Sequence, residues 1–442
     1  MLNTILSNIK ESLLNIGVNQ LNPMQQEVME NFESKNDLLL LAKTGSGKTI
    51  AFLLPILLKI KADSLSQTLI VAPTRELVLQ IESVAKSLKS GLNIMSCYGG
   101  NPVKAELNKL LENPSVIIST PGRLCDHISR NYINLESLNV LVLDEYDKCL
   151  EFGFQDQLEF IIKHITSKSF KKILVSATEI NNYPSFIKLN DLVTLNYFSE
   201  PPVDLTFYKI KTTESYLQSE LSQLLLNFGK EKSIVFCNFR ESVSKITSFL
   251  KSSGFSAVSY HGLLDQSERE RSLMKFRNGT ATVLVSTDLS SRGLDISELN
   301  HIVHTEFPDK EASFIHRNGR TARMNAKGNC YLLYKEEDVT IDYLEKFIAI
   351  AQPINLKLQN EIEIPEMETI YFSGGKRDKI NKIDLVGFLI HSCRLMPEQI
   401  GLIQVNAEES FVAVKKSAVQ LILQNGQQQK VKGKKLKIAI AK

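Results

Sequence analysis

Short apolar runs alternate with longer amphipathic segments through the first part of the chain. Each run contains consecutive apolar residues rather than an apolar residue at every second position, which is typical of strands buried on both faces of a parallel sheet. The segments between them carry apolar residues at helical spacing. The expected strands are residues 38–41, 68–72, 94–98, 115–119, 140–143 and 172–176. The pattern predicts an α/β domain with helices on both faces of its sheet.

The same alternation begins again after a short interruption. Residues 198–203 contain Pro201 and Pro202, and because paired prolines stop regular structure, we expect a linker there. Beyond it, strand-like runs lie at residues 233–237, 257–260, 282–286 and 301–304. They predict a second α/β domain.

A third domain with a different pattern is expected after residues 351–368, a second linker with two prolines and four glutamates. The remaining residues read β-α-β-β-α-β, the order of a ferredoxin-like fold and of RNA-recognition modules. Its segments are residues 369–373, 382–392, 400–405, 410–414, 416–423 and 434–439. A chain of 442 residues is too long for one core, and we expect domains at 1–200, 204–352 and 367–442.

The net charge of +3 is unevenly distributed along the chain. Residues 369–442 contain 13 Lys or Arg and 5 Asp or Glu, so the last domain carries +8 and the rest of the chain carries −5. Such a concentration favours a polyanionic partner for the last domain. On charge alone, a merely solvated basic face is the alternative.

The six cysteines are scattered and form no Cys-x-x-Cys pair, so they are expected to be buried free thiols in a reducing compartment. The N-terminal residues lack the basic start of a signal peptide, and no apolar run is long enough to span a membrane. We therefore expect a cytoplasmic protein with no membrane partner. A monomeric core is a separate expectation.

A glycine-rich turn stands between the first expected strand and a helix. Residues 42–49 read Ala-Lys-Thr-Gly-Ser-Gly-Lys-Thr, a phosphate-binding loop with alanine in place of its usual first glycine. In such a loop backbone N–H groups face a phosphate, Lys48 reaches the terminal phosphates, and the Thr49 hydroxyl binds Mg²⁺. A chance turn is the alternative, but the strand before it and the helix after it favour ATP and Mg²⁺ as ligands. The expected binding residues are Ala42, Thr44, Gly45, Ser46, Gly47, Lys48 and Thr49.

Two carboxylates follow the expected strand at 140–143. Asp144 is placed to hold Mg²⁺, and Glu145 to act as the base that orients the attacking water. Ordinary surface carboxylates at a strand end are the alternative. Upstream of the loop, Gln25 can pair with adenine because a carboxamide offers a donor and an acceptor at once.

Arg317, Arg320 and Arg323 recur at every third position. On a helix such residues share roughly one face, so they can point together across a cleft toward a transferring phosphate. A basic solvated face is the alternative. The second domain has no phosphate-binding loop of its own, which favours the catalytic interpretation.

In this order, the motifs resemble those of the DEAD-box RNA helicases. The resemblance covers nearly all of residues 17–323 and includes the motifs at 73–77, 99–100, 120–124, 144–147, 176–178 and 316–323. It implies two tandem RecA-like domains and RNA-stimulated ATP hydrolysis that locally unwinds or remodels structured RNA. It also implies that Gln25 reads adenine. The residues that the resemblance implies for coupling hydrolysis to RNA are Ser176, Thr178 and His316, and those that complete the ATP site are Asp295, Arg320 and Arg323. The residues implied along the RNA path are Pro73, Thr74, Arg75, Gly100, Thr120, Gly122, Arg123, Gln266, Arg269, Thr287 and Asp288.

The last domain is similar to the RNA-binding domain that ends DbpA-type helicases, through residues 374–380, 384–387 and 410–414. That resemblance implies an RRM-like fold, ribosomal RNA as partner and large-subunit assembly as setting. The loop cations Lys376, Arg377 and Lys379 are the expected phosphate contacts. Candidates for base stacking are Tyr371, Phe372 and Phe411, of which at least one is expected in the core.

Three features depart from the family pattern. Tyr146 stands where the eponymous tetrapeptide has a small residue, Ala322 replaces a glycine, and residues 1–24 contain no aromatic ring to stack on adenine. Because Tyr146 could weaken coupling through Ser176, the main alternative is an ATP-gated RNA clamp or assembly factor with little unwinding activity. A DNA translocase of the same superfamily is a further alternative, against which Gln25 and the basic tail argue.

Overall fold

The computed structural model describes residues 2–43, 45–60, 68–151, 153–167, 169–180, 182–198, 205–287, 299–321, 328–354, 356, 361–426 and 429–441. The chain forms two compact units, and residue 203 begins the second. In the described part of the chain, every helix is too short or too polar to cross a lipid bilayer.

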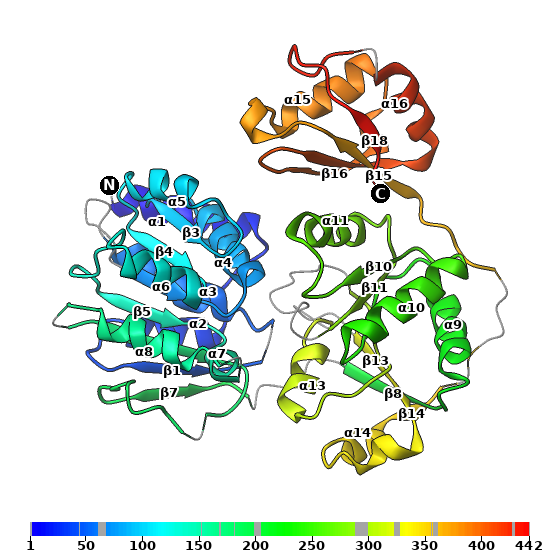
Figure 1. Cartoon of the computed structure of the whole chain (residues 1–442). Helices are drawn as coiled ribbons and strands as arrows, with labels where there is room; N and C mark the ends of the chain where they lie inside the picture. Colours follow the sequence, from blue (N-terminus) through cyan, green and yellow to red (C-terminus); the bar gives the residue numbers. More distant parts are fainter. Residues whose placement is uncertain are drawn as a thin grey trace. The chain divides into compact units, whose positions relative to one another are not determined.

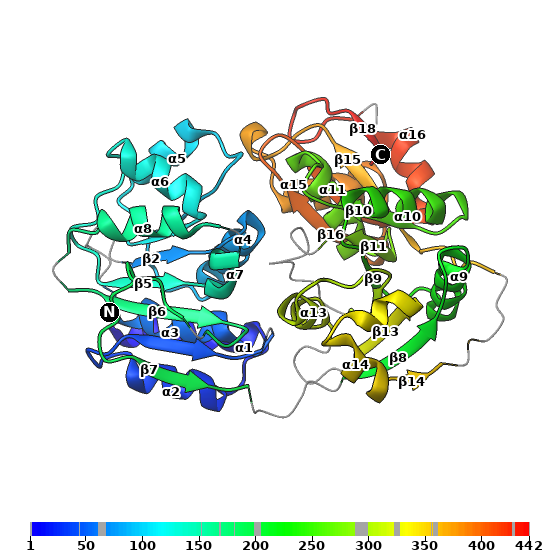
Figure 2. The ribbon, with the colours of Figure 1, turned by 60° about the horizontal axis from the view of Figure 1, so that its bottom comes forward.

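The first unit is built on a seven-stranded sheet of order β3-β4-β2-β5-β6-β1-β7. Its strands are β1 (Leu38–Leu41), β2 (Thr68–Val71), β3 (Ile94–Cys97), β4 (Val116–Ser119), β5 (Val140–Leu143), β6 (Lys171–Ser176) and β7 (Val193–Asn196). All neighbours are parallel. In Figure 2 the labels β2, β5, β6 and β7 mark this order across the sheet, and β1 lies between β6 and β7. The strands expected from the apolar runs are confirmed. Strand β7 was not predicted, because its residues are partly exposed and lack a continuous apolar run.

Helices cover both faces of this sheet (Figure 1). They are α1 (Leu2–Asn15), α2 (Pro23–Asn31), α3 (Lys48–Lys59), α4 (Arg75–Ser87), α5 (Val103–Leu110), α6 (Pro121–Ser129), α7 (Tyr146–Glu151) and α8 (Gln155–Lys163). Successive strand residues point to opposite faces, so Leu38 and Leu40 enter one apolar core while Leu39 and Leu41 enter the other. Burying each leucine of β1 contributes about 1.5–3 kcal/mol to stability.

The second unit contains a further seven-stranded sheet of order β10-β11-β9-β12-β13-β8-β14, with parallel neighbours. Its strands are β8 (Leu205–Lys211), β9 (Ser233–Phe236), β10 (Ala257–Tyr260), β11 (Val283–Ser286), β12 (His301–His304), β13 (Gly328–Tyr334) and β14 (Gln352–Pro353). The accompanying α-helices are α9 (Leu217–Phe228), α10 (Arg240–Ser252), α11 (Gln266–Arg277), α13 (Glu311–Asn318) and α14 (Leu344–Ile350), with a 3-10 turn at Glu336–Thr340. The predicted second α/β domain is confirmed, although β8, β13 and β14 were not predicted.

The last part of the chain forms an antiparallel sheet of order β16-β17-β15-β18. Its strands are β15 (Met367–Phe372), β16 (Ile400–Val405), β17 (Ser410–Lys415) and β18 (Ile438–Ile440). The helices are α15 (Lys382–Gly387), which continues as a π-helix at Phe388–Ser392, and α16 (Val419–Gly426), with 3-10 turns at Lys376–Asp378, Pro397–Gln399 and Lys416–Ala418. The predicted β-α-β-β-α-β order is therefore confirmed.

The two faces of this small sheet differ in what covers them. Phe372 and its alternate neighbours pack into the core beneath α15 and α16. On the other face Phe411 is completely buried against Met274 of α11. The Thr369 hydroxyl accepts a hydrogen bond of 2.8 Å from the Asn278 side chain at the end of α11. The face that carries Phe411 is thus occupied within the second unit.

Candidate nucleotide and RNA sites

The carboxyl ends of the first sheet divide into two neighbouring groups. Strands β5, β6 and β1 lie side by side and lead into Asp144, Ser176 and the loop before Lys48. Strands β3, β4 and β2 form the other half and lead into the segments 98–101, 120–123 and 73–75. Because ligands of parallel sheets bind beyond the carboxyl ends of the strands, this order places the expected ATP residues together and the expected RNA residues together.

The phosphate-binding loop has the backbone that its glycines predict. Gly45 and Gly47 have φ values of 84° and 91°, in the left-handed region that side chains disfavour. Helix α3 begins at Lys48, and the Lys48 ammonium donates to the carbonyl oxygens of Ala42 and Lys43 at 2.5 and 2.9 Å. Thr49 follows in the first turn and is partly exposed. Thr44 lies outside the described residues, and Ser46 is held by Asn22, whose side chain donates to its carbonyl at 3.0 Å.

Gln25 is tied to the same loop. Its side-chain oxygen accepts from the Asn22 backbone N–H at 3.0 Å, and its side-chain nitrogen donates to the Gly47 carbonyl at 3.4 Å. The side chain is therefore almost fully buried, and one donor and one acceptor of its carboxamide are used within the chain. A second N–H and a second lone pair remain for a base, so adenine recognition by Gln25 stays a prediction.

Asp144 is a desolvated carboxylate at the end of β5. Burial, together with the neighbouring Glu145, raises the pKa of Asp144 to about 7, and the Lys48 ammonium opposes that shift. A buried carboxylate beside a second carboxylate suits a divalent cation, which would stabilise its ionised form. Asp144 and the Thr49 hydroxyl are thus the residues that would hold Mg²⁺, whose role would be to neutralise phosphate charge.

The residues after Asp144 connect to β6. Glu145 has a φ of 46°, and one of its carboxylate oxygens is buried with no hydrogen-bond partner in the described part of the chain. The Thr178 hydroxyl donates to Asp147 at 2.9 Å, and the Ser176 hydroxyl accepts from the Thr178 backbone N–H at 3.1 Å. Tyr146 is fully buried among the apolar side chains of the second core. The bulk of Tyr146 is thus accommodated in that core, its hydroxyl has no hydrogen-bond partner in the described part of the chain, and the Thr178–Asp147 bond is made.

Two helix N-termini lie in the half of the sheet edge expected to bind RNA. Thr74 caps α4 by accepting from the Leu77 N–H at 3.3 Å, and Arg75 is the first residue of that helix. Thr120 precedes α6, and Gly122 is exposed in its first turn. Such termini favour phosphate groups because their backbone N–H groups are unpaired.

Gly100 lies close to this region, whereas Pro73 is buried. Gly100 has a φ of 93°, and a Cβ placed there would lie 3.0 Å from the Arg75 guanidinium. The backbone conformation therefore favours glycine at this position, and the loop lies against the Arg75 guanidinium. Pro73 sits beneath the surface, so a direct RNA contact by its ring stays a prediction.

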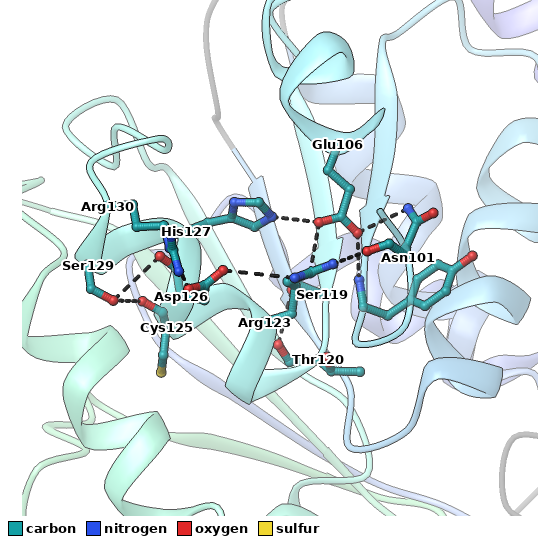
Figure 3. Close-up of polar contacts among 11 residues, drawn as sticks. Asn101, Glu106, Ser119, Thr120, Arg123, Cys125, Asp126, His127, Ser129 and Arg130 are labelled. Atoms are coloured by element: carbon teal, nitrogen blue, oxygen red, sulfur yellow. Dashed lines mark hydrogen bonds and ion pairs between the residues drawn. The ribbon is translucent and has the colours of Figure 1, made fainter. Parts of the chain in front are cut away.

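Arg123 is held by a buried network that was not predicted from the sequence (Figure 3). Its Nε lies 2.9 Å from a carboxylate oxygen of Glu106, and its Nη2 donates to the Asn101 carbonyl. Glu106 also accepts from His127, and both of these residues are fully buried. No local motif marks Glu106, which belongs to an ordinary amphipathic helix.

In the second unit, the expected RNA residues of the described chain gather at neighbouring strand ends. Gln266 begins α11 after β10, and Arg269 donates from Nε to the Leu264 carbonyl at 3.0 Å. Thr287 directly follows β11, which neighbours β10. Asp288, Asp295 and Arg323 lie outside the described residues.

The predicted arginine face of the second unit is wrong for Arg317. Helix α13 ends at Asn318, so Arg317 and Arg320 do not follow one continuous helix. Arg317 donates to the Glu306 carbonyl at 2.6 Å and to the Asn238 side chain at 2.7 Å, and its guanidinium lies over the Phe236 ring. It is fixed within the domain. Arg320 and His316 are also buried, and their catalytic and coupling roles stay predictions.

The basic loop of the last domain meets the lysines near the C-terminus. Lys434 pairs with Asp378 at 2.9 Å, and Lys432 donates to the Lys379 carbonyl at 2.7 Å. Arg377 pairs with Glu408, and Lys376 and Lys379 are exposed. Two basic segments far apart in sequence thus form one surface, which we call the lysine surface: Lys376, Arg377, Lys379, Lys430, Lys432, Lys434, Lys435 and Lys437. Of the candidate stacking residues, Phe372 and Phe411 are buried and only Tyr371 is partly exposed.

Comparison with known proteins agrees with this architecture. Residues 22–185 match the DEAD/DEAH box helicase family, residues 216–325 match the helicase conserved C-terminal domain, and residues 369–440 match the DbpA RNA-binding domain. A solved structure of Mss116p bound to single-stranded RNA and AMP-PNP has a TM-score of 0.71 at 26% identity, and the match covers 81% of this chain and 80% of that one.

Curated relatives extend the similarity over almost the whole chain. The ATP-dependent RNA helicase CshA of Listeria monocytogenes is 31% identical over 85% of this chain and 72% of its own length. The ATP-dependent RNA helicase DbpA of Escherichia coli is 32% identical over 99% of this chain and 97% of its own length. With both helicase domains and the C-terminal domain present in this order, the chain belongs to the DEAD-box family of ATP-dependent RNA helicases.

Proposed function

We propose that this RNA helicase acts on structured ribosomal RNA during assembly of the large subunit, in the cytoplasm, as a monomer. The observation that carries the proposal is the lysine surface, which joins the loop at 376–379 to residues 430–437 on a domain that matches the DbpA RNA-binding domain. A compact basic surface recognises the closely spaced phosphates of folded RNA better than a single extended strand. The six free cysteines support a reducing compartment.

ATP hydrolysis is assigned to residues at the sheet edge of the first domain. Lys48 would exchange the loop carbonyls for the terminal phosphates, and Thr49 and Asp144 would hold Mg²⁺. Glu145 orients the attacking water, for which its unpartnered carboxylate oxygen is suited. Arg320 and Arg323 would neutralise charge that develops on the phosphate when the two domains close, and Asp295 would complete the nucleotide site.

RNA is assigned to the other half of the same edge, with a contribution from the second domain. The helix N-termini at Thr74 and Thr120, with Arg75 and Arg123, offer donors for successive phosphates. Gln266, Arg269, Thr287 and Asp288 would continue the path. Ser176, Thr178 and His316 would transmit the state of the nucleotide to it.

The alternative function as an ATP-gated clamp loses its main argument. That alternative rested on Tyr146, whose bulk could disturb the motif at 176–178. Tyr146 lies in the apolar core, and the Thr178–Asp147 hydrogen bond is made beside it at 2.9 Å. This geometry favours a helicase in which hydrolysis and RNA remodelling are coupled.

The proposed target is tested by crosslinking the protein to RNA in cells and sequencing the bound fragments. We expect fragments clustered on one structured segment of large-subunit ribosomal RNA. A variant with lysine-surface substitutions is the control and should lose that cluster. An even distribution over messenger RNA in both proteins would overturn the proposed target and leave the helicase assignment intact.

A further inference from the structure

Glu106 is a charged residue in an unusual position. It belongs to α5, between the strands β3 and β4, and its side chain is completely buried. Carboxylates are seldom fully buried unless they are paired, because leaving water costs an ion several kcal/mol. The donors that compensate for the burial of the Glu106 charge therefore indicate the role of this residue.

Each oxygen of the Glu106 carboxylate is bound to a different segment of the expected RNA path (Figure 3). Oε1 accepts from the Tyr98 backbone N–H at 3.2 Å and from the Asn101 side chain at 3.1 Å, so it holds both ends of the loop that contains Gly100. Oε2 lies 2.9 Å from Arg123 Nε and 2.7 Å from His127 Nε2, both on α6. One side chain thus links the loop after β3 to the helix after β4.

The contact with Arg123 is an ion pair rather than an aligned hydrogen bond, because its N–H does not point at the carboxylate. His127 supplies the directed bond. Since a carboxylate only accepts, His127 Nε2 must carry the proton, and its Nδ1 has no hydrogen-bond partner in the described part of the chain. Arg123 also donates to the Asn101 carbonyl, which connects α6 directly to the loop that contains Gly100.

The same cluster has the spacing of a metal site, but its chemistry argues against one. Ligand atoms of Cys97, Glu106 and His127 lie within 4.8 Å of one another. The Glu106 carboxylate is already neutralised by Arg123, and burial together with Glu106 raises the pKa of Cys97 to about 12. Both Glu106 oxygens and His127 Nε2 are already used within the cluster, and a metal ion there would also lie beside the Arg123 guanidinium.

We propose that Glu106 is a positioning residue for RNA binding by the first domain. It links the Arg123 guanidinium and the Gly100 loop into one unit, and that loop lies against the Arg75 guanidinium. An arginine ordered before RNA arrives loses less rotamer freedom on binding than a mobile one, so the phosphate contact is stronger. The inference rests on the proposed RNA path and adds a residue that does not itself touch RNA.

The test is Glu106→Gln in the full-length protein. The carboxamide oxygen can replace Oε1. The carboxamide nitrogen can donate to His127 Nε2 if the His127 ring carries its proton on Nδ1 instead. The variant is therefore expected to fold, while the ion pair with Arg123 is lost. The measurement is the poly(U) concentration that half-saturates ATP hydrolysis, together with the turnover number at saturation. We expect half-saturation at about tenfold higher RNA concentration, because a factor of this size corresponds to the rotamer entropy that one arginine regains. The turnover number should be unchanged.

A matched control separates positioning from stability. Asp37 is an equally buried carboxylate at the amino end of the same sheet, where it pairs with Lys172 at 3.1 Å. Asp37→Asn should lower the melting temperature without changing the half-saturating RNA concentration. If both variants shift half-saturation equally, Glu106 acts only through general stability and the proposal is overturned.

Two further variants tie the effect to Arg123 and to the loop. If Glu106 acts through Arg123, adding Arg123→Ala to Glu106→Gln should weaken binding less than the sum of the two single effects. Should Glu106→Gln fail to fold, Asn101→Ala takes its place, because it removes one side-chain donor to the Glu106 carboxylate. It should raise the half-saturating RNA concentration by a smaller factor. Unchanged half-saturation in folded Glu106→Gln, or in Asn101→Ala in its place, overturns the proposal. Unchanged binding in Arg123→Ala would instead refute the proposed RNA path itself.

Discussion

The lysine surface allows a quantitative prediction about the salt dependence of RNA binding. Of its eight cations, Arg377, Lys432 and Lys434 are paired with carboxylates of the same domain. The other members make no ion pair with a described residue: Lys376, Lys379, Lys430, Lys435 and Lys437. Replacing all five by glutamine should remove up to five phosphate contacts while leaving the internal pairs intact.

The magnitude follows from counterion release. Each phosphate contact contributes about 0.7–0.9 to the slope of log affinity against log salt, so the five substitutions should flatten the slope by up to about 4. Raising salt from about 50 to 200 mM should then cost the variant roughly 200-fold less affinity than the parent. Fluorescence anisotropy with a structured ribosomal RNA hairpin measures both slopes.

Substitution in the full chain is a cleaner experiment than truncation. Removing the last domain would uncover Met274 and leave Asn278 without the Thr369 hydroxyl that it binds. A control with the same change in net charge is provided by five exposed lysines elsewhere, replaced by glutamine: Lys10, Lys35, Lys188, Lys245 and Lys251. The reasoning is refuted if this control flattens the slope as much as the lysine-surface variant does.

Further predictions concern the two helicase domains. Glu145→Gln should retain ATP binding and lose RNA-stimulated hydrolysis, and an unchanged rate of phosphate release would refute its assignment as base. Arg320→Ala should lower turnover by about 10³-fold, as loss of an arginine finger does, whereas normal turnover would assign it a purely structural role. Gly47→Ala should destabilise the fold by about 1–2 kcal/mol in chemical denaturation. The change forces a side chain into the left-handed region and places its Cβ 2.6 Å from the Gln25 side chain. As a control, Gly387→Ala has open space around it and should be neutral or stabilising. Burial, with a contribution from Arg317, lowers the pKa of His304 to about 3. Between about pH 6.5 and 3, therefore, only the unfolded chain gains this proton. The free energy of unfolding should be at its full value above that window and about 2 kcal/mol lower at pH 5. His304→Gln should reduce this loss.

The sequence was informative for most strands that are buried on both faces, although the buried strand β13 was missed. Runs such as Leu38–Leu41 can only be satisfied inside a covered parallel sheet, so their place in the fold could be predicted. Strands β7, β8 and β14 have partly exposed residues and mixed patterns, and β14 is only two residues long. Their pairing depends on neighbours far away in the chain, which local patterns do not record.

The side-chain environment of the sites was less accessible to sequence reasoning. The spacing of Arg317 and Arg320 suggested one helical face, but the helix ends at Asn318, and Gly319 was the local signal for that end. Glu106 meets Tyr98 and His127, which are 8 and 21 residues away and come from different elements. Such a pairing follows from the order of the strands and not from any motif.

The central claim is that ATP hydrolysis at this sheet edge drives the remodelling of RNA duplexes. It is tested most directly by strand displacement on matched RNA and DNA duplexes, each joined to the same structured ribosomal RNA segment, with ATP, without ATP, and with the Glu145→Gln variant. The account predicts release of the RNA strand only by the parent protein with ATP. Vigorous ATP hydrolysis without strand release, or equal release of the DNA strand, would contradict it.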